Sequence, residues 1–586
     1  MKETFRNLAS LKGYFVENKG ALFTGVVCLL AVDFLQLLIP LVIKKAVDHL
    51  TIRDATPALL LRYAGIIMAI ALAMALLRYV WRHFLFGISR KIEEGLRNSI
   101  LERLLALPAS FYQKTKTGDI MARSTNDVNA VRMASGMGLV AVTDAVVLGF
   151  AAVGFMIYID LRLTLISLIP APFVVYFTRV LTRRMSTGYD TVQAVFSDLT
   201  EKVRESFSGI RVIKAYSRES WATSVVSGEG KRYILENVQL ARNIGILFPL
   251  MAAFTNLGLA AVIWLGGRLT ILGDITTGDL VAFISYLNLL AWPMMATGWV
   301  TNLLQRGSAS MRRINAVLNE VPEIRDPQRP IAVSALRGRI EFRDLSLTYP
   351  GHDREAVRDI SFEIEKGMTV AFAGHVGSGK TTLLHALARL YDPQKGSILI
   401  DGMEIRTIPL RVLRTEIGFV TQETMIFSDT IRGNVLFGRS GFSDEEVLSA
   451  LKTVQLFEEV QSLEHGIHTL LGERGVSLSG GQRQRLSLAR AIIANPPILV
   501  LDDALSMVDT RTEERIMNQI LASRSGKTTL IVSNRVSTIG RADLVVVMER
   551  GVVVEMGTPG SLMESGREYA RLYEKQILAE ELEIAG

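Results

Sequence analysis

Residues 374–381 read Gly-His-Val-Gly-Ser-Gly-Lys-Thr, which matches the phosphate-binding pattern G-x-x-x-x-G-K-[ST]. The octapeptide follows an apolar run at Thr369–Ala373 and precedes a helix-forming run at Thr382–Leu390, so it lies in the strand–loop–helix context that the pattern needs. Glycines let backbone N–H groups curl around phosphate oxygens, and the start of the helix adds positive potential. We expect Lys380 to reach the β- and γ-phosphates of a nucleotide and Thr381 to bind magnesium. The predicted nucleotide-binding residues of this loop are Gly374, Gly377, Ser378, Gly379, Lys380, Thr381 and Thr382.

Short apolar runs alternate with helix-forming segments from residue 339 onward, a pattern that predicts an α/β domain. One of these runs, Ile498–Leu501, reads as a buried strand and ends in Asp502. An aspartate at the end of such a strand is the second magnesium ligand in P-loop proteins, so we expect Asp502 to hold the ion together with Thr381. The other predicted strands are Ile340–Phe342, Ile360–Ile364, Thr369–Ala373, Gly396–Ile400, Thr528–Ser533 and Leu544–Glu549.

The part of the chain before residue 320 is strongly apolar. The whole chain is 49% hydrophobic with a mean hydropathy of +0.29, and the surplus lies in this part. A helix needs about 20 apolar residues to cross a bilayer. We predict an all-α transmembrane domain at 1–320 that begins with an amphipathic elbow helix, a linker at 321–338, and a nucleotide-binding domain with a C-terminal helix at 339–586. The six predicted spans are 21–46, 57–86, 133–158, 163–182, 243–266 and 280–305.

The charge pattern indicates orientation and excludes some partners. The chain carries a net charge of +7, and its cations gather in the long connections 87–132 and 183–242. The positive-inside rule therefore places both termini in the cytoplasm. No basic run with interleaved aromatic residues is present, so we expect no nucleic-acid partner. The single cysteine, Cys28, excludes an intrachain disulfide and a cysteine-based metal site.

A second motif lies between the P-loop and Asp502. Residues 478–482 read Leu-Ser-Gly-Gly-Gln, and this pentapeptide, together with six spans before one ATP-binding domain, resembles the ABC transporter family over essentially the whole chain. The pattern is most similar to the MdlA/BmrC-like half of bacterial heterodimeric multidrug exporters. The resemblance implies a half-transporter of the bacterial inner membrane that binds ATP and Mg²⁺ and pairs with a second ABC half-transporter, as a heterodimer or, less favoured, a homodimer.

The resemblance also implies roles for single residues. Tyr349 is similar to the aromatic residue that stacks on adenine, and Gln422 to the Q-loop residue that senses magnesium and the membrane domain. The signature serine Ser479 is implied to act on the ATP of the partner subunit. The remaining motif positions implied by the resemblance are the signature residues Gly480, Gly481 and Gln482, the X-loop at 472–475, the D-loop at 506–509, and coupling segments at 117–127 and 208–216.

Two positions depart from the family pattern. Asp503 follows Asp502 where the family has the glutamate that polarises the attacking water, and Asn534 stands where the family has a histidine. Aspartate is one methylene shorter, and a misplacement of about 1 Å can cost about 100-fold in rate. Asparagine can donate a hydrogen bond to phosphate but carries no positive charge and no imidazole. We therefore predict a degenerate site that binds ATP and hydrolyses it slowly.

Polar side chains inside the predicted spans are candidates for contact with a substrate. Intramembrane carboxylates are costly, and they usually face a cavity or a partner. For these residues the sequence leaves open whether they line a substrate pathway or form structural hydrogen bonds. The polar candidates are Asp33, Gln36, Asp144, Asn256 and Asn288, and the sixth span adds Tyr286, Trp292, Met294, Met295 and Trp299.

An ATPase domain joined to a bundle of membrane spans favours transport over simple binding. We predict ATP-driven export of hydrophobic or amphipathic small molecules. A lipid flippase has the same sequence features and stays open as an alternative. A regulator or channel gated by ATP is a further alternative, which the intact signature at 478–482 disfavours, because a pure sensor need not keep catalytic parts for a partner.

Overall fold

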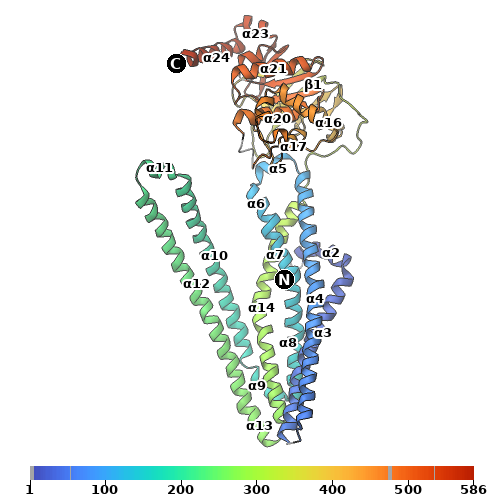
Figure 1. The fold of residues 1–586 in the computed structure, drawn as a ribbon, viewed down its shortest axis with the longest axis vertical. Coiled ribbons are helices and arrows are strands. Elements are labelled where there is room, and N and C mark those ends of the chain that lie inside the picture. Colours follow the sequence, from blue (N-terminus) through green and yellow to red (C-terminus); the bar gives the residue numbers. More distant parts are fainter. Residues whose placement is uncertain (1–5, 53, 473–477, 534, 586) are drawn as a thin grey trace. The chain divides into compact units, whose positions relative to one another are not determined.

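The structure is a computed structural model that describes residues 6–52, 54–472, 478–533 and 535–585. The chain forms two compact units. The helical unit comprises Met1–Leu105 and Thr117–Glu320, and the α/β unit comprises Ala106–Lys116 and Val321–Gly586. The predicted fold class is confirmed, because the first unit is all helix and the second contains two sheets covered by helices (Figure 1).

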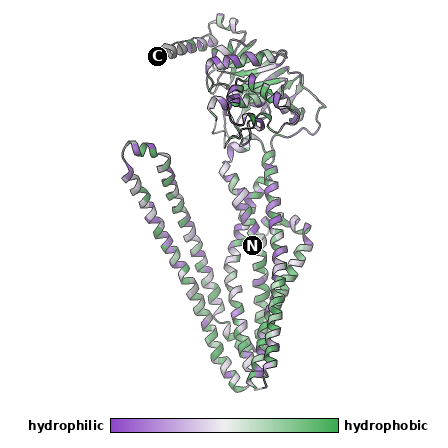
Figure 2. Cartoon of the chain, viewed as in Figure 1, coloured by the Kyte–Doolittle hydropathy of each residue, from purple (hydrophilic) through white to green (hydrophobic). Residues whose placement is uncertain are grey.

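Six helical segments of the described chain are long and apolar enough to cross a membrane. Figure 2 shows the apolar residues concentrated along these helices. Most of these helical segments are longer than the apolar spans predicted within them, because the helices continue through the charged connections. α4, for example, is a single helix of 50 residues. The six segments are Lys19–Thr51 (α3), Pro57–Ala106 (α4), Thr117–Ile159 (ending in α8, Leu139–Ile159), Leu161–Ser208 (ending in α10, Ala171–Ser208), Ala252–Leu272 (from α12, Glu219–Ala261) and Thr277–Leu318 (α14).

α14 packs against α3 and α8 and forms the centre of the helical unit. Tyr286 of α14 is fully buried, and its hydroxyl donates a hydrogen bond of 2.8 Å to the carbonyl oxygen of Leu37 on α3. Lys44 and Asp279 join the same two helices by an ion pair of 2.6 Å. At Gly278 a Cβ atom would lie 2.3 Å from the carbonyl oxygen of Lys44, so only glycine allows this close approach. Tyr286 therefore forms a structural hydrogen bond between α14 and α3.

A helical hairpin extends from the helical unit. It consists of α10, the short helix α11 (Ile210–Ala215) and α12, and α10 and α12 pack along each other. Figure 1 shows the α11 end of the hairpin running apart from α14. Aromatic side chains near this end are exposed, with Phe207 at 72%, Tyr216 at 75% and Trp221 at 61%. Such a group of exposed aromatic residues is typical of a surface that another protein covers.

The α/β unit contains a four-stranded antiparallel sheet and a six-stranded, mainly parallel sheet. The antiparallel sheet has the order β2-β1-β4-β5 and the other sheet the order β10-β9-β3-β8-β7-β6. Three of the strands were not predicted from the sequence, namely β5, β6 and β10. The strands are β1 (Ile340–Thr348), β2 (Glu355–Ile364), β3 (Thr369–Ala373), β4 (Lys395–Ile400), β5 (Met403–Glu404), β6 (Ile417–Val420), β7 (Ile498–Asp502), β8 (Thr528–Val532), β9 (Leu544–Glu549) and β10 (Val552–Gly557).

The parallel sheet positions the candidate site. β3 and β7 both pair in parallel with β8, so their carboxyl ends lie at the same edge of the sheet. The phosphate-binding loop follows β3, and Asp502 ends β7. Ligands of open α/β sheets bind at such an edge.

One short helix before residue 117 belongs to the α/β unit. α5 (Ala109–Lys114) packs Ala109 against the core of that unit, and the hydroxyl of Ser110 donates a hydrogen bond of 3.1 Å to Glu323. The first coupling segment, predicted at 117–127, begins after α5 and belongs to the helical unit, and its coupling role stays a prediction. The predicted segment begins the third long helix, because its apolar and charged residues continue the helical pattern without a break.

Candidate nucleotide-binding site

The loop from Gly374 to Gly379 links β3 to α15 (Lys380–Leu387) through a path that only glycine can follow. Gly374, Gly377 and Gly379 have φ values of 140°, 82° and 103°. A Cβ atom on Gly374 would lie 2.1 Å from the carbonyl oxygen of Met548, and one on Gly379 would lie 2.7 Å from that of Ala356. The glycines therefore allow both the turn and the close contact with neighbouring strands.

Lys380 crosses the inside of this loop. Its Nζ donates hydrogen bonds to the carbonyl oxygens of Gly374 (2.7 Å) and His375 (2.9 Å) and to the hydroxyl of Ser378 (3.2 Å). The side chain is buried, and this burial lowers its pKa. A buried ammonium group held by neutral oxygens gains most from an anion, so the loop is suited to phosphate.

Asp502 and Thr381 offer oxygen atoms for a magnesium ion. Thr381 Oγ1 donates a hydrogen bond of 3.0 Å to Asp502 Oδ1. Asp502 is only 1% exposed, and its Oδ2 atom has no hydrogen-bond partner among the described residues. Burial raises the pKa of this carboxyl group, and the charge of Asp503 raises it further. A buried carboxylate oxygen without a partner fits a site that takes Mg²⁺, which prefers oxygen ligands and is held through one or two carboxylates and phosphate.

Asp503 has a left-handed backbone conformation, with φ of 49°, which aspartate tolerates better than most residues. Its N–H donates a hydrogen bond of 3.0 Å to the carbonyl oxygen of Val532 on β8. Burial raises the pKa of its carboxyl group, while Arg535, Lys380 and a hydrogen bond from Gln422 lower it. The structure thus brings Gln422 to Asp503. Asn534 lies outside the described residues.

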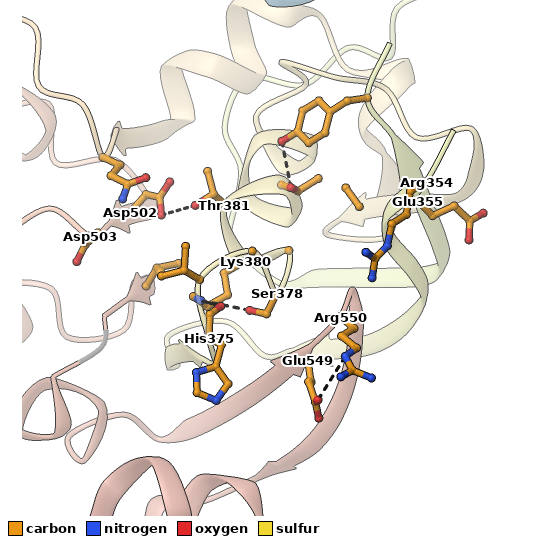
Figure 3. A pocket seen from close by; sticks show the side chains of 18 of the residues that line it. Arg354, Glu355, His375, Ser378, Lys380, Thr381, Asp502, Asp503, Glu549 and Arg550 are labelled. Atoms are coloured by element: carbon orange, nitrogen blue, oxygen red, sulfur yellow. Dashed lines mark hydrogen bonds and ion pairs between the residues drawn. The ribbon is translucent and has the colours of Figure 1, made fainter. Parts of the chain in front are cut away.

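These residues line a pocket of about 720 Å³ (Figure 3). Tyr349 lines it as well, and its hydroxyl donates a hydrogen bond of 3.0 Å to Thr382 Oγ1. In Figure 3, Asp502 and Asp503 lie on one side of the pocket, and a group of charged side chains lies on the other. The sequence did not predict this second group, because its members come from two distant segments, near the start of β2 and at the end of β9, and no local motif marks them. Its members are Arg354, Glu355, Glu549 and Arg550.

The signature residues lie elsewhere in the α/β unit. Ser479 is the N-cap of α20 (Gly480–Ile492), and its hydroxyl accepts a hydrogen bond of 3.2 Å from the backbone N–H of Gln482. A Cβ atom on Gly480 would lie 2.6 Å from Met507 Sδ, and one on Gly481 would lie 2.9 Å from the Met507 carbonyl oxygen. The two glycines therefore let the start of α20 pack on the 506–509 loop. None of the residues 478–482 lines the 720 Å³ pocket.

The structure thus brings most predicted residues together and separates a few. Residues 375–382 of the P-loop, Tyr349, Gln422, Asp502 and Asp503 line one pocket, and Gly374 does not line it. Ser479 is exposed at a separate helix start, whose other residues, Gly480, Gly481 and Gln482, are half-buried. Of the X-loop, residues 473–477 lie outside the described chain.

Comparison with known proteins agrees with this geometry. A family model described as "ABC transporter transmembrane region" matches residues 22–294, and one described as "ABC transporter" matches residues 357–506. The chain is 36% identical to a probable multidrug resistance ABC transporter ATP-binding/permease protein, YheI of Bacillus subtilis, over 97% of both chains. This chain belongs to the ABC transporter family.

Further relatives place this ABC transporter among exporters of the multidrug or lipid-flippase type. It is 33% identical to the multidrug resistance-like ATP-binding protein MdlA of Escherichia coli, over 99% of this chain and 98% of that protein. It is 32% identical to an ATP-dependent lipid A-core flippase of Syntrophus aciditrophicus, over 94% and 92%. A bacterial Atm1-family ABC exporter with ATP bound superimposes with a TM-score of 0.78 at 27% identity, over 97% of this chain and 99% of that one. The predicted likeness to MdlA is confirmed.

Proposed function

We propose that this ABC transporter is one half of a two-subunit exporter of hydrophobic or amphipathic small molecules in the bacterial inner membrane, with both termini in the cytoplasm. The separation of two ATP-binding elements carries the proposal. Lys380, Thr381 and Asp502, which are suited to phosphate and magnesium, line the P-loop pocket, while the start of α20, with the exposed Ser479, lies outside that pocket. A helix start with an exposed hydroxyl group that can donate, and with backbone amides, binds anions, so α20 is suited to the γ-phosphate of ATP bound by a second subunit.

Each subunit then supplies half of two ATP sites. Lys380 and the loop glycines hold the phosphates of this chain's ATP, and Asp502 and Thr381 hold Mg²⁺, which neutralises charge on the β- and γ-phosphates. The partner's signature covers this ATP, and Ser479 covers the partner's ATP. Closure of the two α/β units on ATP would drive the spans from an inward-facing to an outward-facing state, because only the closed state completes both sites.

A heterodimer is favoured because this chain's own site departs from the family at Asp503 and Asn534. The carboxylate of Asp503 is held by Gln422 at one methylene less reach than glutamate would have. We propose slow hydrolysis at this site and faster hydrolysis at the site to which Ser479 contributes. The partner should carry glutamate and histidine at the corresponding positions.

Transport into inside-out membrane vesicles tests the proposal. Vesicles that contain this chain and its partner should accumulate the dye Hoechst 33342 when Mg²⁺ and ATP are present, and the Lys380→Ala variant in both subunits should not. Lys395→Ala, an exposed lysine of β4 in the same unit, is the matched control and should keep uptake. Dye accumulation that persists in the double Lys380→Ala form would contradict the proposal.

A lipid flippase is the second candidate, supported by the similarity to the lipid A-core flippase. The same vesicles distinguish the two activities if they carry a fluorescent phospholipid whose outer-leaflet label is quenched by dithionite. ATP-dependent lipid movement without dye uptake favours a flippase. Ion current without ATP-dependent movement of either compound favours a channel gated by ATP.

A further inference from the structure

Four membrane-spanning helices enclose a polar pocket of about 260 Å³ inside the helical unit. Asp33 and Gln36 come from α3, Arg78 from α4, Asp144 from α8 and Asn288 from α14. The structure therefore brings together four of the five polar residues that the sequence marked in the spans. The fifth, Asn256 of α12, is exposed and lies outside this pocket.

Several polar atoms of this pocket have no hydrogen-bond partner in the part of the chain that the structure describes. Asp33 is 4% exposed, and its Oδ2 has no hydrogen-bond partner among the described residues. The same holds for Oδ1 of Asp144 and for Nε1 of the buried Trp81, which also lines the pocket. The guanidinium of Arg78 donates a long hydrogen bond, 3.5 Å, to Oε1 of Gln36. Leaving such groups unpaired in a membrane is costly, so a ligand that pairs them would be stabilised in this pocket.

The charged groups and the indole rings of the pocket indicate which kind of ligand would pair these atoms. Two carboxylates and one guanidinium leave one negative charge in excess when all are ionised. The two unpaired carboxylate oxygens accept hydrogen bonds, so a cation with N–H donors satisfies both. The indole rings of Trp81 and Trp292 also line the pocket and add surfaces for a cation and its apolar body. A metal ion fits poorly, since no cluster of three or more His, Cys, Asp or Glu that could hold one occurs in the described chain.

We propose that this pocket binds the protonated amino group of a lipophilic amine. Asp33 and Asp144 accept its N–H hydrogen bonds, Arg78 limits the site to a single positive charge, and the indoles hold the adjacent carbon chain. The inference rests on the proposed exporter function and specifies one substrate class. It also explains why an apolar bundle keeps two carboxylates at the middle of its spans.

Binding of three matched probes to the purified transporter in lipid nanodiscs tests this inference without variants. Dansylcadaverine carries a primary ammonium group, its N-acetyl derivative is neutral, and its N-trimethyl derivative keeps the charge but has no N–H donor on that nitrogen. We expect the ammonium probe to bind at least about tenfold more tightly than the neutral one, the size of one charge-assisted hydrogen bond. The trimethyl probe should fall between them. Equal binding of all three would overturn the inference.

Variants then assign the preference to the two carboxylates. Asp33→Asn and Asp144→Asn keep the side-chain shape and remove the charge. Each variant should therefore lower the ratio of the affinity for the ammonium probe to the affinity for the neutral probe, and in the double variant this ratio should be close to one. Asp190→Asn, on the exposed part of α10, is the matched control and should keep it. A full preference in a double variant that still binds ATP would overturn the inference and assign the carboxylates a structural role.

The amine-binding inference and the proposed exporter function can fail independently of each other. ATP-dependent uptake of the neutral N-acetyl probe or of the dye can persist while the ammonium preference is absent. In that case the exporter function stands and the amine site does not. Loss of all ATP-dependent transport in the wild type would contradict the exporter function instead.

Discussion

At the scale of single residues, the position of the Asp503 carboxylate is central to the proposed slow hydrolysis of ATP. Asp503 is held by two hydrogen bonds, because its backbone N–H donates to the carbonyl oxygen of Val532 and its carboxylate accepts from Gln422. Its reach toward the γ-phosphate therefore depends on side-chain length. The P-loop and Asp502 could be predicted from sequence, since each is local to one strand end. Arg354 and Arg550 could not, because no local motif marks them and they come to the pocket from turns that are far apart in the sequence.

Lengthening Asp503 tests the proposed cause of slow hydrolysis. Asp503→Glu should raise ATP turnover at this chain's own site by about 10- to 100-fold, because it restores the missing reach. The rate is measured on the purified transporter whose partner carries an inactivated P-loop. Asp503→Asn is the matched control and should not exceed the wild-type rate. An unchanged rate in Asp503→Glu would show that this carboxylate does not limit hydrolysis.

Removing the charge of Asp502 should separate stability from function. Because burial raises the pKa of Asp502, the folded protein binds its proton more tightly than the unfolded chain does. The free energy of unfolding therefore falls as pH rises from the usual carboxyl pKa through the raised one. Asp502→Asn should raise the Tm of the nucleotide-free protein at pH 7, by about 1–3 kcal/mol in stability, and abolish magnesium-dependent ATP binding. If Asp502→Asn had a lower Tm than the wild type at pH 7, this would contradict the conclusion that the buried charge of Asp502 destabilises the nucleotide-free protein.

At the scale of elements, apolar length and apolar runs predicted most of the fold. All six long helices and the strands that form the centre of the parallel sheet were found in this way, because burial on every side leaves a continuous apolar run. β5 and β6 are short, and β10 is partly exposed, so they leave a weak signal. The short helix α5 was not predicted separately, because α5 and the start of the third long helix have similar mixed patterns.

The contact between α20 and the 506–509 loop predicts the effect of a single methyl group. In Gly481→Ala the new Cβ would lie 2.9 Å from the backbone oxygen of Met507, which cannot move cheaply. We expect a loss of about 1–3 kcal/mol in stability and a loss of ATP turnover at the partner's site. Gly228→Ala, in an open part of α12, is the control and should be neutral or stabilising. Thermal unfolding and ATPase assays measure both effects.

At the scale of the whole molecule, the α10–α12 hairpin predicts a second subunit. Phe207 and Trp221 are 72% and 61% exposed, and they lie in the charged connection between the fourth and fifth predicted spans. Replacing both with serine should weaken pairing with the partner while ATP binding to the P-loop remains, because the variants lie in the other unit. Size-exclusion chromatography with light scattering measures the pairing. A stable pair in the variant would remove the hairpin from the interface.

The asymmetric pair is the central claim, and nucleotide trapping tests it most directly. The purified two-subunit transporter is incubated with Mg²⁺, a photoreactive ATP analogue and vanadate, and the label on each subunit is then measured after cross-linking. We predict that vanadate-trapped label gathers on the partner's P-loop, that this chain retains intact triphosphate, and that Ser479→Ala in this chain abolishes trapping on the partner. Equal trapping on both subunits, with no effect of Ser479→Ala on the partner, would contradict the claim.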